Sequence, residues 1–356
     1  MKRLPNLDAL RFFLAVLVLI YHIPQLCKNQ GLPYFDYLPI FKRGIDAVYM
    51  FFVLSGFLII KIIYQEKIDA KFSIKKFYLR RVLRIFPLYF LILVFGFTFY
   101  HMILPLVGIP YENNYSLVEG ILLCVFFLPN VFTNLYDPGG ILEILWSIGV
   151  EEQFYLLVAP LMFFIKPKRL LLVLVLITII YFCLFHTSSF SFLQKYQFVY
   201  FFVFAGGITA ILEQKNYFSF LKVSAIIPLL IVIATIFYFT TDLFQFETRW
   251  LHNLVTSVLF SLLVHTLAYN NFGFELKNKI INYFGKISYG IYMFHAIALN
   301  LVVFIFLKVK FVSNLNEFAI VLLINILTFA ITILLAHISY KYFESYFLKL
   351  KQKFRA

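Results

Sequence analysis

Long apolar stretches fill almost the whole chain, and they decide which kind of fold is possible. A helix needs about 20 mostly apolar residues to cross a lipid bilayer. Hydrophobic residues make up 62% of the chain and charged residues 13%, whereas a soluble domain is about 45–50% apolar and about 25% charged. The sequence therefore predicts an all-α membrane bundle of about ten transmembrane helices, at residues 7–27, 46–64, 80–104, 145–165, 169–187, 196–213, 222–240, 250–269, 279–307 and 317–343.

One further apolar stretch, 117–133, is short and ends in Leu-Pro-Asn. We expect a re-entrant or surface-lying helix there, with a true eleventh span as the alternative. An eleventh crossing would invert every later segment and would place the basic residues at 166–169 outside. The distribution of positive charge thus favours ten spans.

Lysine and arginine predict the orientation of the bundle. With the N-terminus inside, 21 of the 31 Lys and Arg residues lie in inner segments, 7 in outer segments and 3 within spans. This bias follows the positive-inside rule, so we expect both termini to be cytoplasmic. It also accounts for the net charge of +14 without a nucleic-acid partner.

We expect one membrane domain at 1–343 and a basic cytoplasmic tail at 344–356. A cleaved signal peptide is not expected, because Asp8 and Arg11 interrupt the first apolar run.

The first span carries ionisable residues at both ends. Arg11 and His22 are 11 residues apart, which is within about 20° of three full helical turns and about 16 Å along the axis. Asp8 precedes Arg11 by three residues, so the two side chains can form an ion pair. Either these groups form one wall of a polar route through the bundle, or they only anchor the helix ends at the two membrane surfaces.

Two later segments offer further charges whose role the residues alone leave open. Asp46 lies at the predicted outer end of the second span and is either a cavity residue or an ordinary helix-end residue. Arg81 and Arg84 are three residues apart at the predicted cytoplasmic mouth of the third span. Arginine binds phosphate in a bidentate manner, so this pair is either a phosphate site or a boundary anchor.

Two predicted spans carry polar residues at helical spacing. In LWSIGVEEQFYLL, 145–157, Ser147, Glu151 and Tyr155 share one helix face, and Glu152 is adjacent. Two glutamates within an apolar run indicate a water-filled or protein-lined cavity. In FGKISYGIYMFH, 284–295, a similar face carries Ser288, Tyr292 and His295, with His295 near mid-membrane. Such a histidine is either a packing residue or a cavity residue. We assign no role to His101, His186, His252, His265 and His337.

The longest outer segment, 105–144, contains no Lys or Arg and carries Glu112, Glu119, Asp137 and Glu143. It is a candidate lid or acceptor-binding surface. No metal site is predicted, because the sequence lacks HExxH and CxxC motifs and its three cysteines are widely spaced. Walker A, dinucleotide-binding and GxSxG motifs are absent as well.

Five segments, taken in order, resemble the acyltransferase-3 family of bacterial membrane acyltransferases: LDALRFFLAVLVLIYH, GIDAVYMFFVLSGFLI, RRVLRIFP, WSIGVEEQFYLL and GKISYGIYMFH. The resemblance covers about residues 5–295. It implies a multi-pass enzyme of the bacterial inner membrane that transfers an acyl group, commonly acetyl from acetyl-CoA, onto a saccharide hydroxyl. The family's functional residues fall on Arg11 and His22, on Arg81 and Arg84, and, after Trp146, on Ser147, Glu151 and Glu152. Some relatives carry a C-terminal esterase-like domain, and we expect the standalone form here.

The resemblance leads to a specific mechanistic hypothesis. His22 would act as the base, or as an acyl carrier, near an outer acceptor. The phosphates of a cytoplasmic acyl-CoA donor would be held by Arg81 and Arg84, with Arg11 as a further candidate. Glu151 or Glu152 would orient His22 or bind a saccharide or lipid-linked saccharide acceptor. The expected substrate-binding or cavity residues are Asp8, Asp46, Ser147, Tyr155, Ser288, Tyr292 and His295.

Two alternative functions stay open at this point. One is a polytopic transporter or flippase for a polysaccharide precursor or a small solute, and the other is a structural partner without catalysis, in which the clustered Arg, Glu and His groups would be costly and unused. A transporter of this kind is expected to show inverted repeats, with glycine- or proline-broken spans in matched positions. No convincing pair of such segments is visible in the sequence.

Overall fold

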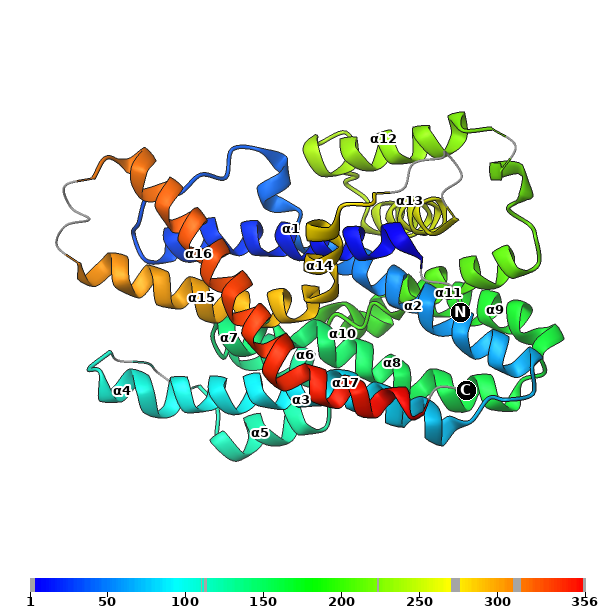
Figure 1. Cartoon of the computed structure of the whole chain (residues 1–356), viewed down its shortest axis with the longest axis horizontal. Helices are drawn as coiled ribbons and strands as arrows, with labels where there is room; N and C mark the ends of the chain where they lie inside the picture. The colour runs from blue at the N-terminus through cyan, green and yellow to red at the C-terminus, as the bar shows by residue number, and fades with distance from the viewer. Residues whose placement is uncertain are drawn as a thin grey trace. The chain divides into compact units, whose positions relative to one another are not determined.

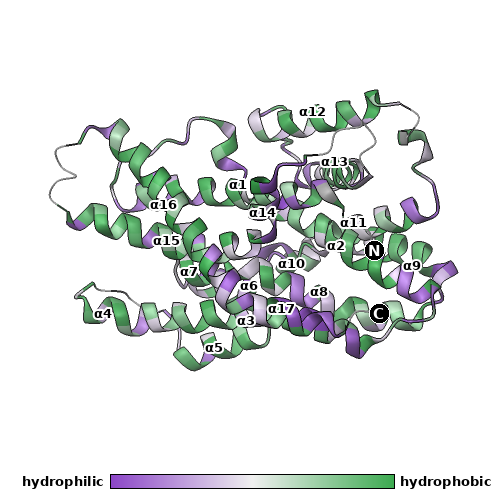
Figure 2. Ribbon diagram, in the orientation of Figure 1, coloured by the Kyte–Doolittle hydropathy of each residue, from purple (hydrophilic) through white to green (hydrophobic). Residues whose placement is uncertain are grey.

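A computed structural model describes residues 4–109, 111, 114–222, 224–269, 276–309 and 315–354, and these residues form helices and connecting turns without a β-strand (Figure 1). Seven of the described helices are long and apolar enough to cross a membrane. They are α1 (Pro5–Asn29), α2 (Gly44–Ile68), α3 (Ile74–Thr98, prolonged through Leu106), α9 (Pro167–Phe185), α13 (Arg249–Tyr269), α15 (Ser288–Lys308) and α16 (Glu317–Ser339, prolonged through Gln352). Figure 2 shows these helices as largely hydrophobic. The predicted all-α, multi-span architecture is therefore confirmed.

Three of the predicted spans are not among these seven described helices. The stretch 145–165 forms the unbroken 20-residue helix α8 (Leu145–Phe164), and 222–240 forms the shorter, 15-residue helix α12 (Ile226–Thr240). The stretch 196–213 forms α11 (Tyr200–Gln214), which together with the preceding segment Ser188–Lys195 makes an eighth candidate span, bent by 85°. The stretch 279–307 divides into α14 (Lys279–Lys286) and α15. The count of ten spans stays a prediction.

The stretch 117–133 does not form one straight crossing helix. It contains α5 (Leu117–Val125), and α6 (Pro129–Tyr136) follows after a turn in which Phe127 has a φ of 59°. Neither helix approaches the length of about 20 residues that a crossing requires. The short helix α7 (Gly140–Glu143) then leads into α8.

The chain forms two compact units, which we describe separately. Unit 1 comprises residues 1–54 and 212–341, and unit 2 comprises residues 55–211 and 342–356. In unit 1, α1 packs against α14 and α15, and α15 packs along α16 (Figure 1). Leu19 and Ile23 of α1 are buried in an apolar cluster with Val302 of α15 and Ile324 of α16. This packing fixes the face that α1 turns toward α15.

Unit 2 is organised around the rest of α2, α3 and α8. Gly56 of α2 lies against the backbone of α11 so closely that a Cβ atom there would be 1.8 Å from the Val203 carbonyl oxygen. Only glycine permits that approach, as is common where membrane helices pack closely. The residues of the predicted basic tail include α17 (Ser345–Gln352), which packs on α3. The Arg80 guanidinium of α3 donates to the Phe354 carbonyl and pairs with Glu66 at 2.9 Å.

Several helix ends are stabilised by side-chain caps that can be read from the sequence. The Asn316 side chain accepts a hydrogen bond from the Ala319 amide at the start of α16, and the Asn278 side chain does the same for Ile280 at the start of α14. Ser73 caps α3 in the same way. Such caps satisfy amide groups that have no partner within the helix, and they help to fix where α3, α14 and α16 begin.

Candidate functional site

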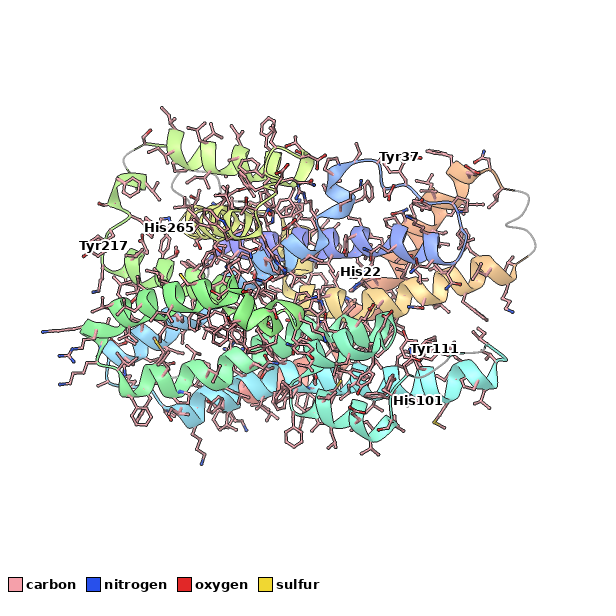
Figure 3. The ribbon with its side chains drawn as sticks, turned by 180° about the vertical axis from the view of Figure 1, so that it is seen from behind. His22, Tyr37, His101, Tyr111, Tyr217 and His265 are labelled. Atoms are coloured by element: carbon pink, nitrogen blue, oxygen red, sulfur yellow. The ribbon has the colours of Figure 1, made fainter. Side chains whose placement is uncertain are left out.

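Two histidines of unit 1 lie side by side, and we call them the histidine pair. His22 of α1 and His295 of α15 have ring centroids 5.2 Å apart, with the ring planes tilted by 30°. His295 is 1% exposed, whereas His22 is partly exposed. The packing of α1 on α15 brings together two residues that are 273 positions apart in the sequence. Figure 3 labels His22 on α1.

The hydrogen bonds of the pair define what it can do chemically. Nδ1 of His295 lies 2.5 Å from the Tyr292 carbonyl oxygen. A carbonyl oxygen only accepts, so Nδ1 must carry the hydrogen and, in the neutral ring, Nε2 is left as an acceptor. Nε2 is buried without a hydrogen-bond partner among the described residues. His22 bonds the Gln25 side chain, one turn further along α1. Because two charged imidazoles at this separation would repel each other, the pair is suited to holding a single added proton.

The other predicted residues near α1 have well-defined partners. Arg11 donates to Asp8 at 2.8 Å, which is the ion pair that the spacing indicated. The Ser288 hydroxyl donates to the Gly285 carbonyl at 3.0 Å, so it closes the break between α14 and α15. Tyr292 is buried beside His295, with ring centroids 5.6 Å apart. Ser288 and Tyr292 thus shape the start of the helix that carries His295.

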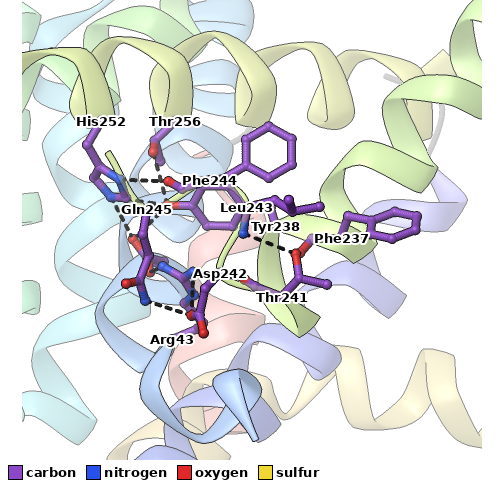
Figure 4. Close-up of polar contacts among 11 residues, drawn as sticks. Arg43, Phe237, Tyr238, Thr241, Asp242, Leu243, Phe244, Gln245, His252 and Thr256 are labelled. Carbon is purple, nitrogen blue, oxygen red and sulfur yellow. Dashed lines mark hydrogen bonds and ion pairs between the residues drawn. The ribbon is translucent and has the colours of Figure 1, made fainter. Parts of the chain in front are cut away.

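Asp46 lies at the start of α2 among groups that include Arg43, Tyr238 and His252, which Figure 4 labels. Its Oδ1 accepts a hydrogen bond from the Tyr238 hydroxyl at 2.9 Å and lies 3.4 Å from Nε2 of His252. Its Oδ2 lies 3.5 Å from the guanidinium of Arg43, which is 4% exposed and also donates to the Thr241 carbonyl. Three helix ends meet here, namely the start of α2, the end of α12 and the start of α13. We call this group the Asp46 cluster.

A second set of predicted residues meets in unit 2, and we call it the Glu151 cluster. The Glu151 carboxylate of α8 accepts hydrogen bonds from the Ser55 hydroxyl of α2 and from the Tyr155 hydroxyl one turn further along α8. The two hydroxyl oxygens lie 2.6 Å apart. The Arg81 guanidinium of α3 lies over the Tyr155 ring, 5.7 Å from its centroid, and close enough to Glu151 for attraction. The spacing of Glu151 and Tyr155 indicated this shared face, but it did not indicate Ser55.

The two arginines of the predicted phosphate site differ in their exposure to solvent. Arg81 is 8% exposed and lies between the rings of Phe77 and Tyr155, at 5.8 and 5.7 Å from their centroids. Its Nε atom has no hydrogen-bond partner among the described residues. Arg84, one turn further along α3, is exposed. Arg84 is therefore the accessible member of the pair, while Arg81 serves the Glu151 cluster.

Ser147 and Glu152 are both buried in unit 2, each about 4% exposed. One carboxyl oxygen of Glu152, Oε1, has no hydrogen-bond partner among the described residues. The neighbouring Gln153 holds α8 in place, since its amide donates to Asn130 Oδ1 at 2.8 Å. The sequence analysis did not single out Gln153, although its position directly after two glutamates in an apolar run was a usable signal.

Sequence reasoning also passed over two histidines that have carboxylate partners in unit 1. His252 approaches Asp46, and Nε2 of His265 lies 2.7 Å from Glu213 Oε2. His265 is fully buried and Glu213 is 7% exposed. Both histidines belong to α13, and the signal that could have found them is the recurrence of polar residues every three or four positions along that helix.

The acidic segment 105–144 contains a pair of carboxyl groups, those of Asp137 and Glu143. Burial, together with the hydrogen bond and the charge of Asp137, raises the pKa of Glu143 to about 7. Nearby, Tyr100 and Tyr111 stack with ring centroids 4.6 Å apart. Glu112 lies outside the described residues. Within the described part of the chain, no three His, Cys, Asp or Glu side chains form a group that could hold a metal ion.

Comparison with known proteins identifies the family. The family described as "Acyltransferase domain" matches residues 4–337. A putative acetyltransferase, ORF330, of Acidianus two-tailed virus is 27% identical over 304 residues, which is 82% of each chain. The O-acetyltransferase OatA of Staphylococcus aureus is 26% identical over 191 residues, covering 50% of this chain and 28% of that protein. The peptidoglycan O-acetyltransferase OatA of Listeria monocytogenes is 30% identical over 188 residues, covering 49% and 27%.

The matched region thus spans little more than a quarter of either OatA protein. No solved structure matches the chain. The family match nonetheless extends over nearly all of the sequence, and it includes the histidine pair as well as the Glu151 cluster. The chain therefore belongs to the acyltransferase-3 family and is an O-acyltransferase with several membrane-spanning helices.

Proposed function

We propose that the protein transfers an acetyl group from cytoplasmic acetyl-CoA onto a hydroxyl of an envelope or extracellular saccharide. It would act in the bacterial inner membrane as a bundle of ten spans with both termini in the cytoplasm. The family match and the names of the OatA relatives support O-acetylation. The excess of Lys and Arg in the inner segments supports the orientation.

The observation that carries this proposal is the histidine pair. Acyl transfer to a hydroxyl needs a base that takes the hydroxyl proton. His22 is partly exposed and would meet the acceptor, while His295 is buried behind it and presents Nε2 as an acceptor. Neutral imidazole is a suitable base near neutral pH. Arg11, at the other end of α1, is paired with Asp8 and would lie toward the donor side.

The Glu151 cluster would serve the donor half of the reaction. Exposed Arg84 would bind the donor phosphates, because guanidinium groups bind phosphate oxygens in a bidentate manner. Arg81 would fix Glu151 and Tyr155 beside the route of the acyl chain. Glu152 and Ser147, which are buried on the same helix, would line that route.

The test compares four forms of the protein in a host strain that lacks the gene. They are wild type, His22→Ala, Arg11→Ala and His186→Ala, the last a matched control on α9. Acetate released from envelope glycans by mild alkali measures O-acetylation, and immunoblots of membranes measure insertion. We expect the His22 and Arg11 variants to insert normally and to release no acetate above background, and His186→Ala to resemble wild type. Normal acetylation by inserted His22→Ala and Arg11→Ala would sink the proposal.

A second measurement identifies the acceptor class. Mass spectrometry of peptidoglycan and surface polysaccharide from cells with and without the gene locates the added acetyl groups. If no saccharide gains acetyl while the protein is present in the membrane, the acceptor assignment is wrong even if acetyl-CoA is consumed.

A further inference from the structure

Helix α13 buries most of its polar side chains. Leu254 and Val258 are 43% and 51% exposed, whereas seven polar residues along the helix, at intervals of one to four positions, are buried or partly buried. These are His252, which is partly buried, and Asn253, Thr256, Ser257, Ser261, His265 and Thr266, which are each at most 7% exposed. Polar groups inside a membrane helix are costly and usually functional, so a row of buried polar groups at four-residue spacing, Asn253, Ser257, Ser261 and His265, calls for an explanation. We call the seven residues the α13 stripe.

Both ends of the stripe are closed by a histidine with a carboxylate partner. At one end, the Tyr238 hydroxyl contacts Asp46, His252 and Thr256 at 2.9, 3.3 and 3.0 Å (Figure 4). At the other end, His265, labelled in Figure 3, lies 2.7 Å from Glu213. The two histidines are 13 residues apart, or about 20 Å along the helix. That distance is two thirds of the roughly 30 Å of hydrocarbon in a bilayer.

Each end is also close to exposed polar groups. Beside the Asp46 cluster, Asp242 is exposed and lies 3.7 Å from the Arg43 guanidinium. Two residues beyond Glu213, Lys215 is exposed at the end of α11. The stripe therefore runs from near one surface of unit 1 to near another, with titratable groups at both ends.

The stripe contains two hydroxyls, one in its middle and one at its last residue, that have no hydrogen-bond partner among the described residues. They are Ser261 Oγ and Thr266 Oγ1, and both are buried. Serine and threonine in membrane helices usually bond back to the carbonyl four residues earlier, as Ser257 does to Asn253. Buried polar groups without a protein partner are commonly paired with water. Asn253, Ser257, Ser261 and His265 succeed one another at four-residue spacing, so their side chains are neighbours about one turn apart, a separation that a single bridging water spans.

We propose that the α13 stripe conducts protons through unit 1 during acyl transfer. This inference rests on the proposed function. In that reaction the O–H bond of the acceptor and the thioester C–S bond break, an ester C–O bond forms, and the departing sulfur gains a proton. If the hydroxyl and the sulfur are on opposite sides of the membrane, one proton must cross for each acyl group transferred.

The stripe also has a structural link to the histidine pair. Helix α13 packs against α1. At the start of α2, the Gly44 backbone lies against Tyr21, where a Cβ would be 2.3 Å from the ring, and Tyr21 is in edge contact with His22. Tyr49 interacts electrostatically with both Asp46 and Tyr21. The two tyrosines therefore connect His22 with Asp46 through these interactions, and their hydroxyl groups would carry a proton from His22 toward α13.

The experiment measures proton flux without either substrate. The full-length protein is reconstituted into vesicles of phosphatidylethanolamine and phosphatidylglycerol that contain potassium and a trapped pH-sensitive dye. Valinomycin then sets an inside-negative potential. We compare Thr256→Val and Ser261→Val with Thr256→Ser, which keeps the hydroxyl. Thr178→Val is the matched control, because it makes the same change on α9, where the hydroxyl only bonds the Leu174 carbonyl.

Wild-type vesicles should acidify faster than protein-free vesicles. The two valine variants on α13 should lose most of that flux, while Thr256→Ser and Thr178→Val should retain it. Wild-type flux equal to that of empty vesicles, or undiminished flux in both α13 valine variants, overturns the proposal. Thr256→Ser changes the same position but keeps the hydroxyl, so flux in this variant shows that the loss in Thr256→Val comes from the missing hydroxyl and not from misfolding. Flux in a protein that transfers no acetyl refutes the proposed function alone, whereas acetyl transfer without flux refutes the proton path alone.

Discussion

The histidine pair in unit 1 and the Glu151 cluster in unit 2 both combine buried and partly buried polar residues, but they are bonded in opposite ways. In the pair, Nε2 of His295 has no hydrogen-bond partner among the described residues. In the cluster, the Glu151 carboxylate accepts from Ser55 and Tyr155, with Arg81 over the Tyr155 ring. One arrangement leaves a lone pair available, and the other uses hydrogen bonds and a neighbouring cation to hold an anion in place.

This difference separates two chemical roles. A base must have a lone pair that can take a proton, and a carboxylate already surrounded by donors is better suited to fixing its neighbours than to accepting another hydrogen. The histidine pair is thus the candidate for proton transfer, and the Glu151 cluster is the candidate for positioning. The predictions below test this division, beginning with the largest expected effect.

Replacing His22 should have the largest effect on activity. We expect His22→Ala to lower kcat for acetyl transfer by about 10²–10⁴-fold, the usual contribution of a general base, without a comparable change in KM for the donor. His295→Ala should also lower kcat, but by a smaller factor, because His295 is buried and only His22 is partly exposed. Steady-state rates with purified protein measure both effects.

A replacement that keeps a hydrogen-bonding nitrogen distinguishes base chemistry from packing. His22→Gln retains polarity and similar volume but cannot take a proton near neutral pH. If His22→Gln keeps wild-type kcat, the histidine pair does not act as the base. The assignment of proton transfer to the histidine pair and of positioning to the Glu151 cluster would then be wrong.

Neutralising Glu151 should have the next largest effect. We expect Glu151→Gln to destabilise the fold by about 1.5–3 kcal/mol, because the charged acceptor of the Ser55 and Tyr155 hydroxyls is replaced by a neutral amide. Arg81, which is 8% exposed, would also lose the attraction of a nearby opposite charge. Thermal melting in detergent measures the loss, and Arg84→Gln, at the exposed neighbouring site, is the matched control. A Glu151→Gln protein that melts like wild type and also keeps full activity would show that the cluster positions nothing.

Sequence reasoning reached the components of both clusters but not their assembly. Helical spacing placed Ser147, Glu151 and Tyr155 on one face because the period of a helix is local information. The pairing of His22 with His295, and of Ser55 with Glu151, depends on which helices pack against each other, and spacing within one helix contains no record of that. The ion pair of Asp8 and Arg11 was predictable because both partners lie on the same turn.

The α13 helix shows a different limit of the sequence analysis. Its hydroxyl residues are ordinary in membrane helices, and only the burial of Ser257 and Ser261 at four-residue spacing with His265 makes them notable. Asp46 was identified as a helix-end residue without its partners, because Tyr238 and His252 come from helices about 200 residues later. The apolar runs predicted the helical membrane architecture, since hydropathy and length suffice for that purpose.

Removing the Tyr155 hydroxyl should have a smaller effect than neutralising Glu151. We expect Tyr155→Phe to cost about 1 kcal/mol of stability, the value of one hydrogen bond, and less than a tenfold loss of kcat. The ring that faces Arg81 remains in this variant. Tyr155→Leu removes the ring as well, and should cost a further 0.5–2 kcal/mol or so from the lost cation–π contact. Equal losses in both variants would mean that the ring contributes nothing to holding Arg81.

The smallest effect on activity is expected at Glu143, a carboxyl group of unit 2 that faces another carboxyl instead of hydroxyl donors. Burial, the hydrogen bond with Asp137 and the charge of Asp137 raise the pKa of Glu143 from 4.5 to about 7 in the folded protein. The folded state therefore binds more protons than the unfolded state between these values. Its free energy of unfolding should fall as the pH rises from about 4.5 to 7, by at most about 3 kcal/mol.

Glu143→Gln removes this titration and keeps a hydrogen-bonding side chain in place. Wild type should melt at a lower temperature at pH 8 than at pH 5, and the difference should shrink in Glu143→Gln, with kcat almost unchanged. Glu119→Gln, a change in the same outer segment at a residue bonded to the Tyr136 hydroxyl, should keep the wild-type pH dependence. If Glu143→Gln retains the full pH dependence, another group titrates. The contrast between a carboxyl held by donors and one that shares a proton would then not apply to unit 2.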